Sequence, residues 1–166
     1  MNTRPAASEG RYIPLVPEDD VISALAKQER ETDALLRSIG EQKAAFRYAL
    51  GKWSIKMLVG HFVDTERIFA YRLLAIARGE TQSLPGYDEN NYAAASNANE
   101  RKLSDLIDEY HAVRTATLTL LRGLSTEAWE RTGIANEKNV SVRAIAFNAL
   151  GHERHHLNIL RERYGV

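Results

Sequence analysis

Two long stretches of helical character constrain the fold of this 166-residue chain most strongly. Residues 141–164 contain no proline and repeat apolar side chains at helical spacing, with Ser141 suited to the N-cap position. Residues 54–78 are apolar on more than half of the helical circumference, which predicts a helix packed against several neighbours. The chain shows no strand-like alternation of any length, so we expect an all-α fold.

Two more helices complete a predicted four-helix bundle. Pro17 suits the first position of a helix that we expect to end just before Gly40, and the acidic residues after Pro17 complement the helix dipole. Residues 101–123 repeat apolar side chains in one stripe. Residues 1–16 hold prolines and a glycine among small polar residues, which predicts an arm on the surface or against the bundle. We therefore expect an N-terminal arm, residues 1–16, and a single bundle domain, residues 17–166.

The connections between the predicted helices differ in length and composition. Residues 41–53 are expected to be partly helical at most. Residues 80–100 form a long loop rich in Asn and Ser, and loops of this length are often functional or mobile. The sequence leaves open whether this loop covers a metal site. Residues 125–140 combine a short helical turn through Trp129 with a polar loop over residues 133–139.

The charge balance and the absence of cysteine exclude several classes of protein. Lys+Arg and Asp+Glu are both 22, and a formal net charge of zero argues against a dedicated nucleic-acid binder. Since the chain has no cysteine, a bound metal must be held by His, Asp or Glu. No apolar run approaches the length of a membrane span, and the polar N-terminus lacks a signal-peptide pattern. We therefore expect a cytoplasmic protein with no membrane or nucleic-acid partner.

Three of the five histidines lie within residues 151–160. His152 and His156 fall one turn apart in the apolar stripe of the last helix, whereas His155 points to another side. Two imidazoles at i, i+4 can bind one divalent ion, but a third ligand must come from elsewhere. His61, on an apolar face of the second long helix, is the candidate. The alternative is that these histidines are core residues satisfied by hydrogen bonds.

A glycine precedes the first histidine of each helix, as Gly60-His61 and Gly151-His152. The missing side chains would let the two helices approach each other around a shared ion. The alternative is that the glycines only relieve helix packing. In either case, each glycine costs roughly 1 kcal/mol of helix propensity, which packing must offset.

His152, Glu153 and His156 also match the zinc-protease pattern, in which a glutamate follows the first of two histidines at i, i+4. Such a protease needs a third ligand, usually downstream, and only ten residues follow His156. We interpret the match as coincidental, and Glu153 as a solvated carboxylate or one that supports the ligands. His111 lies off the apolar stripe of its helix and is predicted to be exposed. His155 is predicted not to bind the metal.

Five further assignments concern chemistry and binding. Asp64 and Glu153 are the candidate catalytic acids or bases. Arg72, Asn148 and Trp53 are candidates for substrate binding. The alternatives are an ion pair with a bundle carboxylate for Arg72, a bond to a backbone group for Asn148, and a core anchor for Trp53.

The sequence resembles the DinB/YfiT-like superfamily of metalloenzymes over about residues 17–164. The resemblance is carried by Gly-Lys-Trp-Ser-Ile at residues 51–55, by a glycine before His61 with Asp64 following, and by Gly-His-Glu-Arg-His-His at residues 151–156. It implies an up-down-down-up four-helix bundle, often dimeric. It also implies a bound divalent ion, nickel or zinc in the first place and iron or manganese as further candidates.

The ligands that the resemblance implies here are His61, His152 and His156. The chain departs from the family pattern at Leu50, where a proline is expected, and at Met57, where an acidic residue is common. Neither residue is a ligand. The departures therefore leave the expected metal site intact.

Relatives in this superfamily suggest two kinds of reaction. Some are thiol S-transferases or isomerases that use bacillithiol, mycothiol or glutathione, and others are called metal-dependent hydrolases. Our first expectation is a low-molecular-weight-thiol S-transferase that acts on a small molecule as a homodimer. The alternatives are a metal-dependent hydrolase with a metal-bound water and a non-catalytic, metal-containing bundle that binds a small molecule or a partner.

Overall fold

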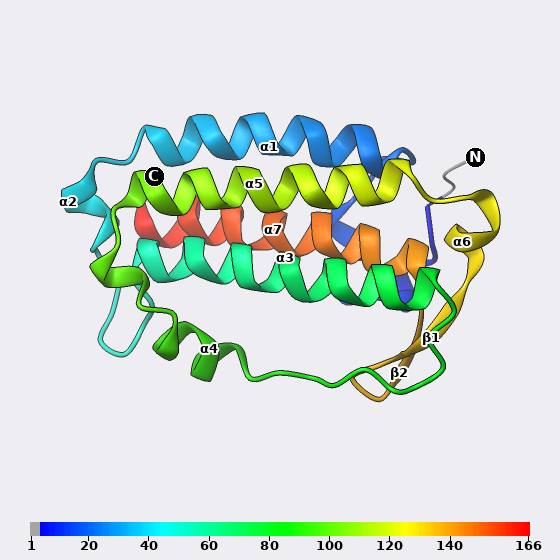
Figure 1. Ribbon diagram of the computed structural model, residues 1–166. Helices are drawn as coiled ribbons and strands as arrows, with labels where there is room; N and C mark the ends of the chain where they lie inside the picture. The colour runs from blue at the N-terminus through cyan, green and yellow to red at the C-terminus, as the bar shows by residue number, and fades with distance from the viewer. Residues whose placement is uncertain (1–3) are drawn as a thin grey trace.

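Four long helices lie side by side in the computed structural model, which describes residues 4–166 (Figure 1). They are α1 (Val21–Arg37), α3 (Ile55–Ala77), α5 (Leu103–Arg122) and α7 (Val142–Tyr164). Helices α1 and α7 run in one direction along the bundle, and α3 and α5 run in the other (Figure 1). This up-down-down-up order confirms the all-α, four-helix bundle expected from the sequence.

Each long helix has two neighbours in the bundle. Helix α3 packs against α5 and α7, and α1 packs against the same two helices from the other side. Because α3 and α5 are parallel neighbours, the chain between them returns along the outside of the bundle (Figure 1). The resulting arrangement leaves α3 and α7, which carry the candidate ligands, in direct contact.

The helix starts follow from capping side chains. Ser54 accepts a hydrogen bond from the Met57 N–H, and Ser141 accepts one from the Ala144 N–H, as the sequence predicts for Ser141. The expected start of the first helix at Pro17 is wrong. Asp20 accepts from the backbone N–H groups two and three residues later, so it is the N-cap and α1 begins at Val21.

The connection after α1 and the long connection after α3 both contain helix. Residues 41–53 begin with α2 (Glu41–Ala44), and the rest of that segment is irregular, as expected. Residues 80–100 were expected to form one loop, but they contain α4 (Glu89–Ala95) and the 3₁₀ helix η3 (Ala98–Glu100). The side chain of Asp88 caps α4, which explains why so polar a segment forms a helix.

A small β-hairpin corrects the expectation of a polar loop before α7. After α6 (Thr126–Glu130), which contains Trp129 as predicted, β1 (Thr132–Ala135) pairs antiparallel with β2 (Lys138–Ser141). The turn residues Asn136 and Glu137 have φ of 50° and 64°, and positive φ at both positions is what a type I′ hairpin turn requires. Strands of four residues are too short to show a clear alternation.

The N-terminal arm packs into the bundle beside α7. It contains the 3₁₀ helices η1 (Ala7–Glu9) and η2 (Ile13–Leu15), and the side chains of Ile13 and Val16 are fully buried. The guanidinium of Arg154 donates to the Leu15 carbonyl at 2.8 Å and pairs with Glu18. Ile13 and Val16 are therefore part of the core. No helix within residues 4–166 is both long and apolar enough to span a membrane.

The apolar core divides into two clusters, one toward each end of the bundle. Each long helix contributes buried polar side chains to the region between these clusters. We call one group of them the polar layer: Thr32, Glu66, Tyr110, Arg114 and Glu153, all buried. The candidate metal ligands lie at the same level, so the site occupies the middle of the bundle and not one of its ends.

Candidate metal centre

Three imidazoles from two helices converge at the bundle midpoint. The Nε2 atoms of His61 on α3 and His152 on α7 lie 3.0 Å apart, and those of His152 and His156 lie 3.2 Å apart. Each of these three side chains offers a ring nitrogen within 4.8 Å of the other two. The structure thus brings together the three histidines that the sequence nominated as ligands.

The geometry and the chemistry of these residues fit a divalent ion. Ring nitrogens bound to one ion at about 2.0–2.1 Å lie roughly 3 Å from one another, which matches the observed separations. The Nδ1 atom of His156 is buried and has no hydrogen-bond partner within residues 4–166. It is not the nitrogen that faces His152, so the fit to an ion rests on the Nε2 separations.

Burial keeps the three rings neutral near pH 7. It lowers the pKa of His61 to about 4, even though Glu89 acts in the opposite direction. It lowers the pKa of His156 to about 3, with His61 and His155 adding to the effect. For His152 burial and then His156 hold the pKa well below its ordinary value of 6.5. Neutral imidazole is the form that binds metals.

A short chain of hydroxyl groups orients the His61 ring. The Thr65 hydroxyl lies 3.3 Å from the Nδ1 atom of His61 and 2.6 Å from the Tyr87 hydroxyl. A partner at Nδ1 favours the tautomer that leaves Nε2 free to bind a metal. Tyr87 belongs to the connection between α3 and α5. That connection therefore does line the site, a point that the sequence left open.

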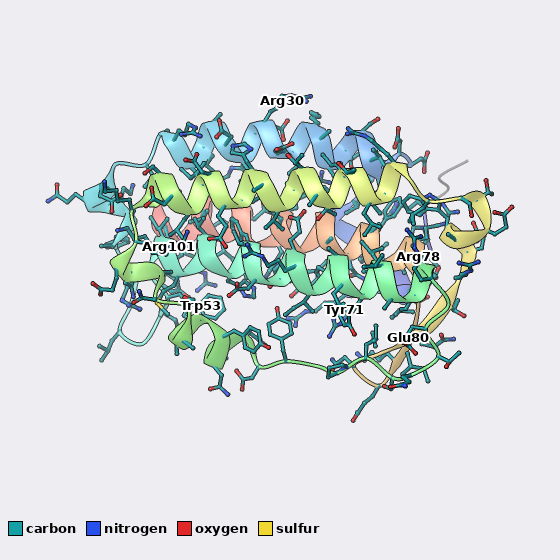
Figure 2. All side chains as sticks on the ribbon, in the orientation of Figure 1. Arg30, Trp53, Tyr71, Arg78, Glu80 and Arg101 are labelled. Atoms are coloured by element: carbon teal, nitrogen blue, oxygen red, sulfur yellow. The ribbon has the colours of Figure 1, made fainter. Side chains whose placement is uncertain are left out.

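The histidines line a cavity of about 440 Å³. Trp53 forms part of the cavity wall, and its ring centroid lies 4.8 Å from that of His61. Figure 2 shows Trp53 next to α4. His155 also lines the cavity, with its ring 5.4 Å from the Tyr12 ring, but it is not one of the three converging ligands. The structure thus gives Trp53 the wall position that was one of its two expected roles.

Neither candidate catalytic carboxylate lines this cavity. Asp64 faces a smaller pocket beside Arg101 and Glu109, where burial raises the pKa of Asp64. Glu153 is buried in the polar layer, so the expectation of a solvated carboxylate is wrong. A step of one residue turns a helix by about 100°, which points Glu153 away from the site when His152 points into it.

The surroundings of Glu153 explain its burial. Its carboxylate accepts hydrogen bonds from the Thr32 hydroxyl at 2.5 Å, from the Tyr110 hydroxyl at 2.8 Å and from the guanidinium of Arg114. These partners come from α1 and α5, on the far side of α7 from the cavity. A carboxylate held this way is no general base at the histidines, which supports the interpretation of the protease pattern as coincidental.

The two glycines before the ligands have a different role from the one expected. A Cβ on Gly60 would lie 3.3 Å from the Ala98 Cβ, and a Cβ on Gly151 would meet the Tyr12 carbonyl, with its carbon at 2.8 Å. Both glycines thus face returning segments, η3 and the N-terminal arm. They accommodate those segments and do not bring α3 and α7 together.

The other sequence candidates have defined contacts. The guanidinium of Arg72 donates to the Pro85 carbonyl at 2.8 Å, and no carboxylate within residues 4–166 forms a salt bridge with it. The side-chain oxygen of Asn148 accepts from the Tyr12 N–H at 3.1 Å. His111 was expected to be exposed, but it is half-buried and bonded to Glu29 and Asp33 of α1.

Several cavity residues could not be found from the sequence. Arg11 and Tyr12 belong to the N-terminal arm, Glu89 begins α4, and Asn136 and Lys138 belong to the hairpin. No local pattern marks these positions. They reach the site only through long-range packing of segments that single-sequence periodicity assigns to loops.

A helical bundle with three imidazoles converging at its midpoint defines a class of protein with a candidate divalent-metal site in its core. The chain belongs to the DinB superfamily, whose family model matches residues 24–160. The match covers most of the bundle, including all three converging histidines. It confirms the family expected from the sequence.

Two similar proteins come from bacteria. One, from Oceanobacillus iheyensis, bears the provisional name metal-dependent hydrolase OB0413 and is 23% identical over 150 residues, 86% of each chain. YfiT from Bacillus subtilis is described as a probable metal-dependent hydrolase with an unusual four-helix bundle topology. It matches with a TM-score of 0.78 and 18% identity, over 89% of this chain and 87% of YfiT. This likeness in structure shows a shared fold.

Proposed function

We propose that the chain is a divalent-metal-dependent enzyme whose leading reaction is the transfer of a low-molecular-weight thiol. One observation carries the proposal: three neutral imidazoles converge in a cavity from which Asp64 and Glu153 are both absent. A divalent ion would lower the pKa of a coordinated thiol, so the reaction needs no carboxylate base. Nickel and zinc are the proposed ions, because imidazole nitrogen suits both.

The chain's own residues bind and orient the reactants in this proposal. His61, His152 and His156 hold the ion, and Thr65 fixes the orientation of His61. Trp53 supplies an aromatic wall that keeps water from one side of the site. The thiol sulfur forms the new bond to an electrophilic carbon, the leaving group departs with its bonding electron pair, and the thiol proton passes to solvent.

A hydrolase is the second candidate, favoured by a carboxylate that the sequence did not nominate. Glu89 lines the cavity that contains the histidines and is the one carboxylate among its lining residues. It could accept a proton from an attacking water molecule, which is the task of a general base. The similar proteins named above are both described as metal-dependent hydrolases.

Replacing Glu89 separates the two reactions. Metal-loaded protein is assayed with bacillithiol, mycothiol, glutathione and cysteine in the presence of a fluorogenic electrophile, and then with ester and amide substrates. For a transferase, Glu89→Gln keeps most of the activity. For a hydrolase, Glu89→Gln lowers kcat by about 100-fold or more. The matched control is Glu31→Gln, an exposed carboxylate on α1 that is paired with Lys27.

Each outcome selects one candidate. Thiol transfer that survives Glu89→Gln supports the transferase. Ester or amide hydrolysis that Glu89→Gln abolishes, without turnover of any thiol, overturns it in favour of the hydrolase. If neither reaction occurs but the metal-loaded protein binds the small molecules, the non-catalytic bundle is the better assignment.

A further inference from the structure

A second cavity adjoins the one that contains the histidines. It has a volume of about 590 Å³ and lies between the N-terminal arm, the hairpin, α3 and α7. The two cavities share six lining residues: Arg11, Tyr12, Phe69, Arg72, Asn136 and Lys138. We call this shared group the boundary. A molecule bound at the histidines could therefore extend past the boundary into the second cavity.

Half of the boundary residues are cations, and they come from three separate segments. Arg11 belongs to the arm, Arg72 to α3 and Lys138 to β2. No salt bridge joins any of the three to a carboxylate within residues 4–166. The acidic side chains of the two cavities, Glu9 and Glu89, each line only one of them and are not shared.

Arg72 is the most buried of these cations. It is partly buried, unlike the exposed Arg11 and Lys138, and its side chain donates one hydrogen bond within residues 4–166, to the neutral carbonyl of Pro85. Desolvating a guanidinium without an anion is unfavourable, and an anion that binds there would offset the cost. Two aromatic side chains, Tyr12 and Phe69, lie among the cations and provide apolar surface beside them.

The spacing along α3 sets the size of a fitting ligand. Arg72 follows His61 by three turns, or about 16 Å along the helix axis. Long helical side chains lean toward the N-terminus of their helix, which shortens this gap. Only a ligand several bonds long could reach from the histidines to Arg72. A very small thiol or ester would fill the first cavity alone.

We propose that the boundary is a binding subsite for an anionic group of the substrate, a carboxylate or a phosphate. The reactive end of that substrate lies at the histidines, and the part beyond the anion occupies the second cavity. Arg72 provides the planar donors that pair with such an anion, and Arg11 and Lys138 add positive charge. This deepens the proposed function by naming a substrate class, and it rests on that function for the position of the reactive end.

Two thiols that differ at one end test the subsite. Zinc-loaded protein is titrated calorimetrically with 6-mercaptohexanoate and with 6-mercaptohexan-1-ol, which have the same chain length but differ in the terminal carboxylate. We expect the carboxylate to bind roughly 10-fold more tightly, as a charge-assisted hydrogen bond would give. Inorganic phosphate is added as a competitor. Displacement of the carboxylate by millimolar phosphate indicates a phosphate-type ligand, and no displacement indicates a carboxylate.

Variants place the preference at the boundary. Lys138→Gln and Arg72→Gln should each reduce the preference to about 3-fold or less, whereas Arg30→Gln should retain it. Arg30 lies on the outer side of α1, away from the hairpin (Figure 2). The Lys138 side chain forms no hydrogen bond or salt bridge within residues 4–166, so Lys138→Gln should fold normally. If loss of the Arg72 bond to Pro85 weakens the fold of Arg72→Gln, the Lys138 variant decides the test.

The results separate failure of the subsite from failure of the proposed reaction. Equal affinity for the two thiols, or a preference that the folded boundary variants leave unchanged, overturns the subsite even if thiol transfer occurs. A preference that depends on Lys138 and Arg72 supports the subsite even if no thiol is turned over. Hexanoate, which has no thiol, tests the anion alone and should bind in a Lys138-dependent manner.

Discussion

At the scale of single residues, the three converging imidazoles are the feature with the most direct consequence. We expect His61→Ala, His152→Ala and His156→Ala each to lose most bound metal, because each removes one of three ligands. His155→Gln should retain close to one ion per chain. Elemental analysis of purified protein by mass spectrometry gives the ratio. Full metal occupancy in His61→Ala would rule out the site as described.

His111 makes a second residue-scale prediction, on stability and pH. Hydrogen bonds to Asp33 and then Glu29 raise the pKa of His111 above 6.5, and the bond to His111 lowers the pKa of Asp33, which Arg37 also pairs with. The contribution of His111 to the free energy of unfolding is therefore complete below pH 6.5 and is lost as pH rises through the raised pKa of His111. The contribution of Asp33 to the free energy of unfolding is lost only in more acidic solution, as pH falls through the lowered pKa of Asp33.

The melting temperature of His111→Gln tests the predicted direction of this pH dependence. The variant should be less stable than the parent at about pH 5.5, and the gap should narrow toward about pH 8.5. Circular dichroism at a series of pH values measures both proteins. A gap that is constant or grows with pH would contradict the assignment.

The candidate ligands were predictable from the sequence, but the rest of the cavity was not. His152 and His156 are neighbours on one helix, so helical geometry alone places their rings together. His61 could be predicted as the third ligand because it lies on an apolar face of a second helix. Arg11 and Lys138 come from segments without periodicity, and nothing in their local sequence indicates that they share a cavity with the histidines.

At the scale of elements, Gly151 fixes how the N-terminal arm packs on α7. A methyl group there would meet the Tyr12 carbonyl carbon at 2.8 Å. We expect Gly151→Ala to lower the free energy of unfolding by about 1–3 kcal/mol and to increase proteolysis of the arm. Gly40→Ala is the control, because a Cβ there has nothing within 4 Å and φ is −68°.

Urea denaturation and limited proteolysis measure these two effects. A Gly151→Ala protein as stable as the parent, with an equally protected arm, would show that the arm tolerates displacement from α7. The control should change stability by less than about 1 kcal/mol.

Helical periodicity predicted the long helices. The short elements depend on pairing and capping contacts, which periodicity does not reveal. The four-residue strands hold together through pairing and a turn with positive φ, not through their own alternation. Helix α4 depends on its Asp88 cap, and α1 begins at Val21 because Asp20 caps it. Pro17 suggested a helix start at that residue, but the Asp20 cap places the start at Val21.

At the scale of the whole molecule, the polar layer holds all four long helices to one buried charge. Arg114 pairs with Glu66 through two bonds of 2.7 and 2.8 Å, pairs with Glu153 and donates to the Leu25 carbonyl at 3.1 Å. Although burial opposes it, Glu153 and Glu66 raise the pKa of Arg114 well above its ordinary value. The cation therefore persists in the core.

We expect Arg114→Met to lower the free energy of unfolding by about 3–5 kcal/mol, because it leaves two buried carboxylates without their partner. Arg67→Met, which removes an exposed ion pair with Glu109 on the same pair of helices, should cost less than about 1 kcal/mol. Urea titrations followed by circular dichroism compare the two. Similar losses in both variants would show that the buried charges are not the stabilising feature.

The adjacency of His152 and Glu153 has a consequence for how the chain can misassemble. Apolar helix faces tolerate sliding by one turn, about 5.4 Å, since side chains of similar size replace one another. Here such a slip of α7 would separate His152 from His61 and, in the same movement, strand Glu153 away from Arg114. The register that assembles the site is thus the register that neutralises the buried carboxylates, so a stably folded chain with a misaligned site is energetically disfavoured.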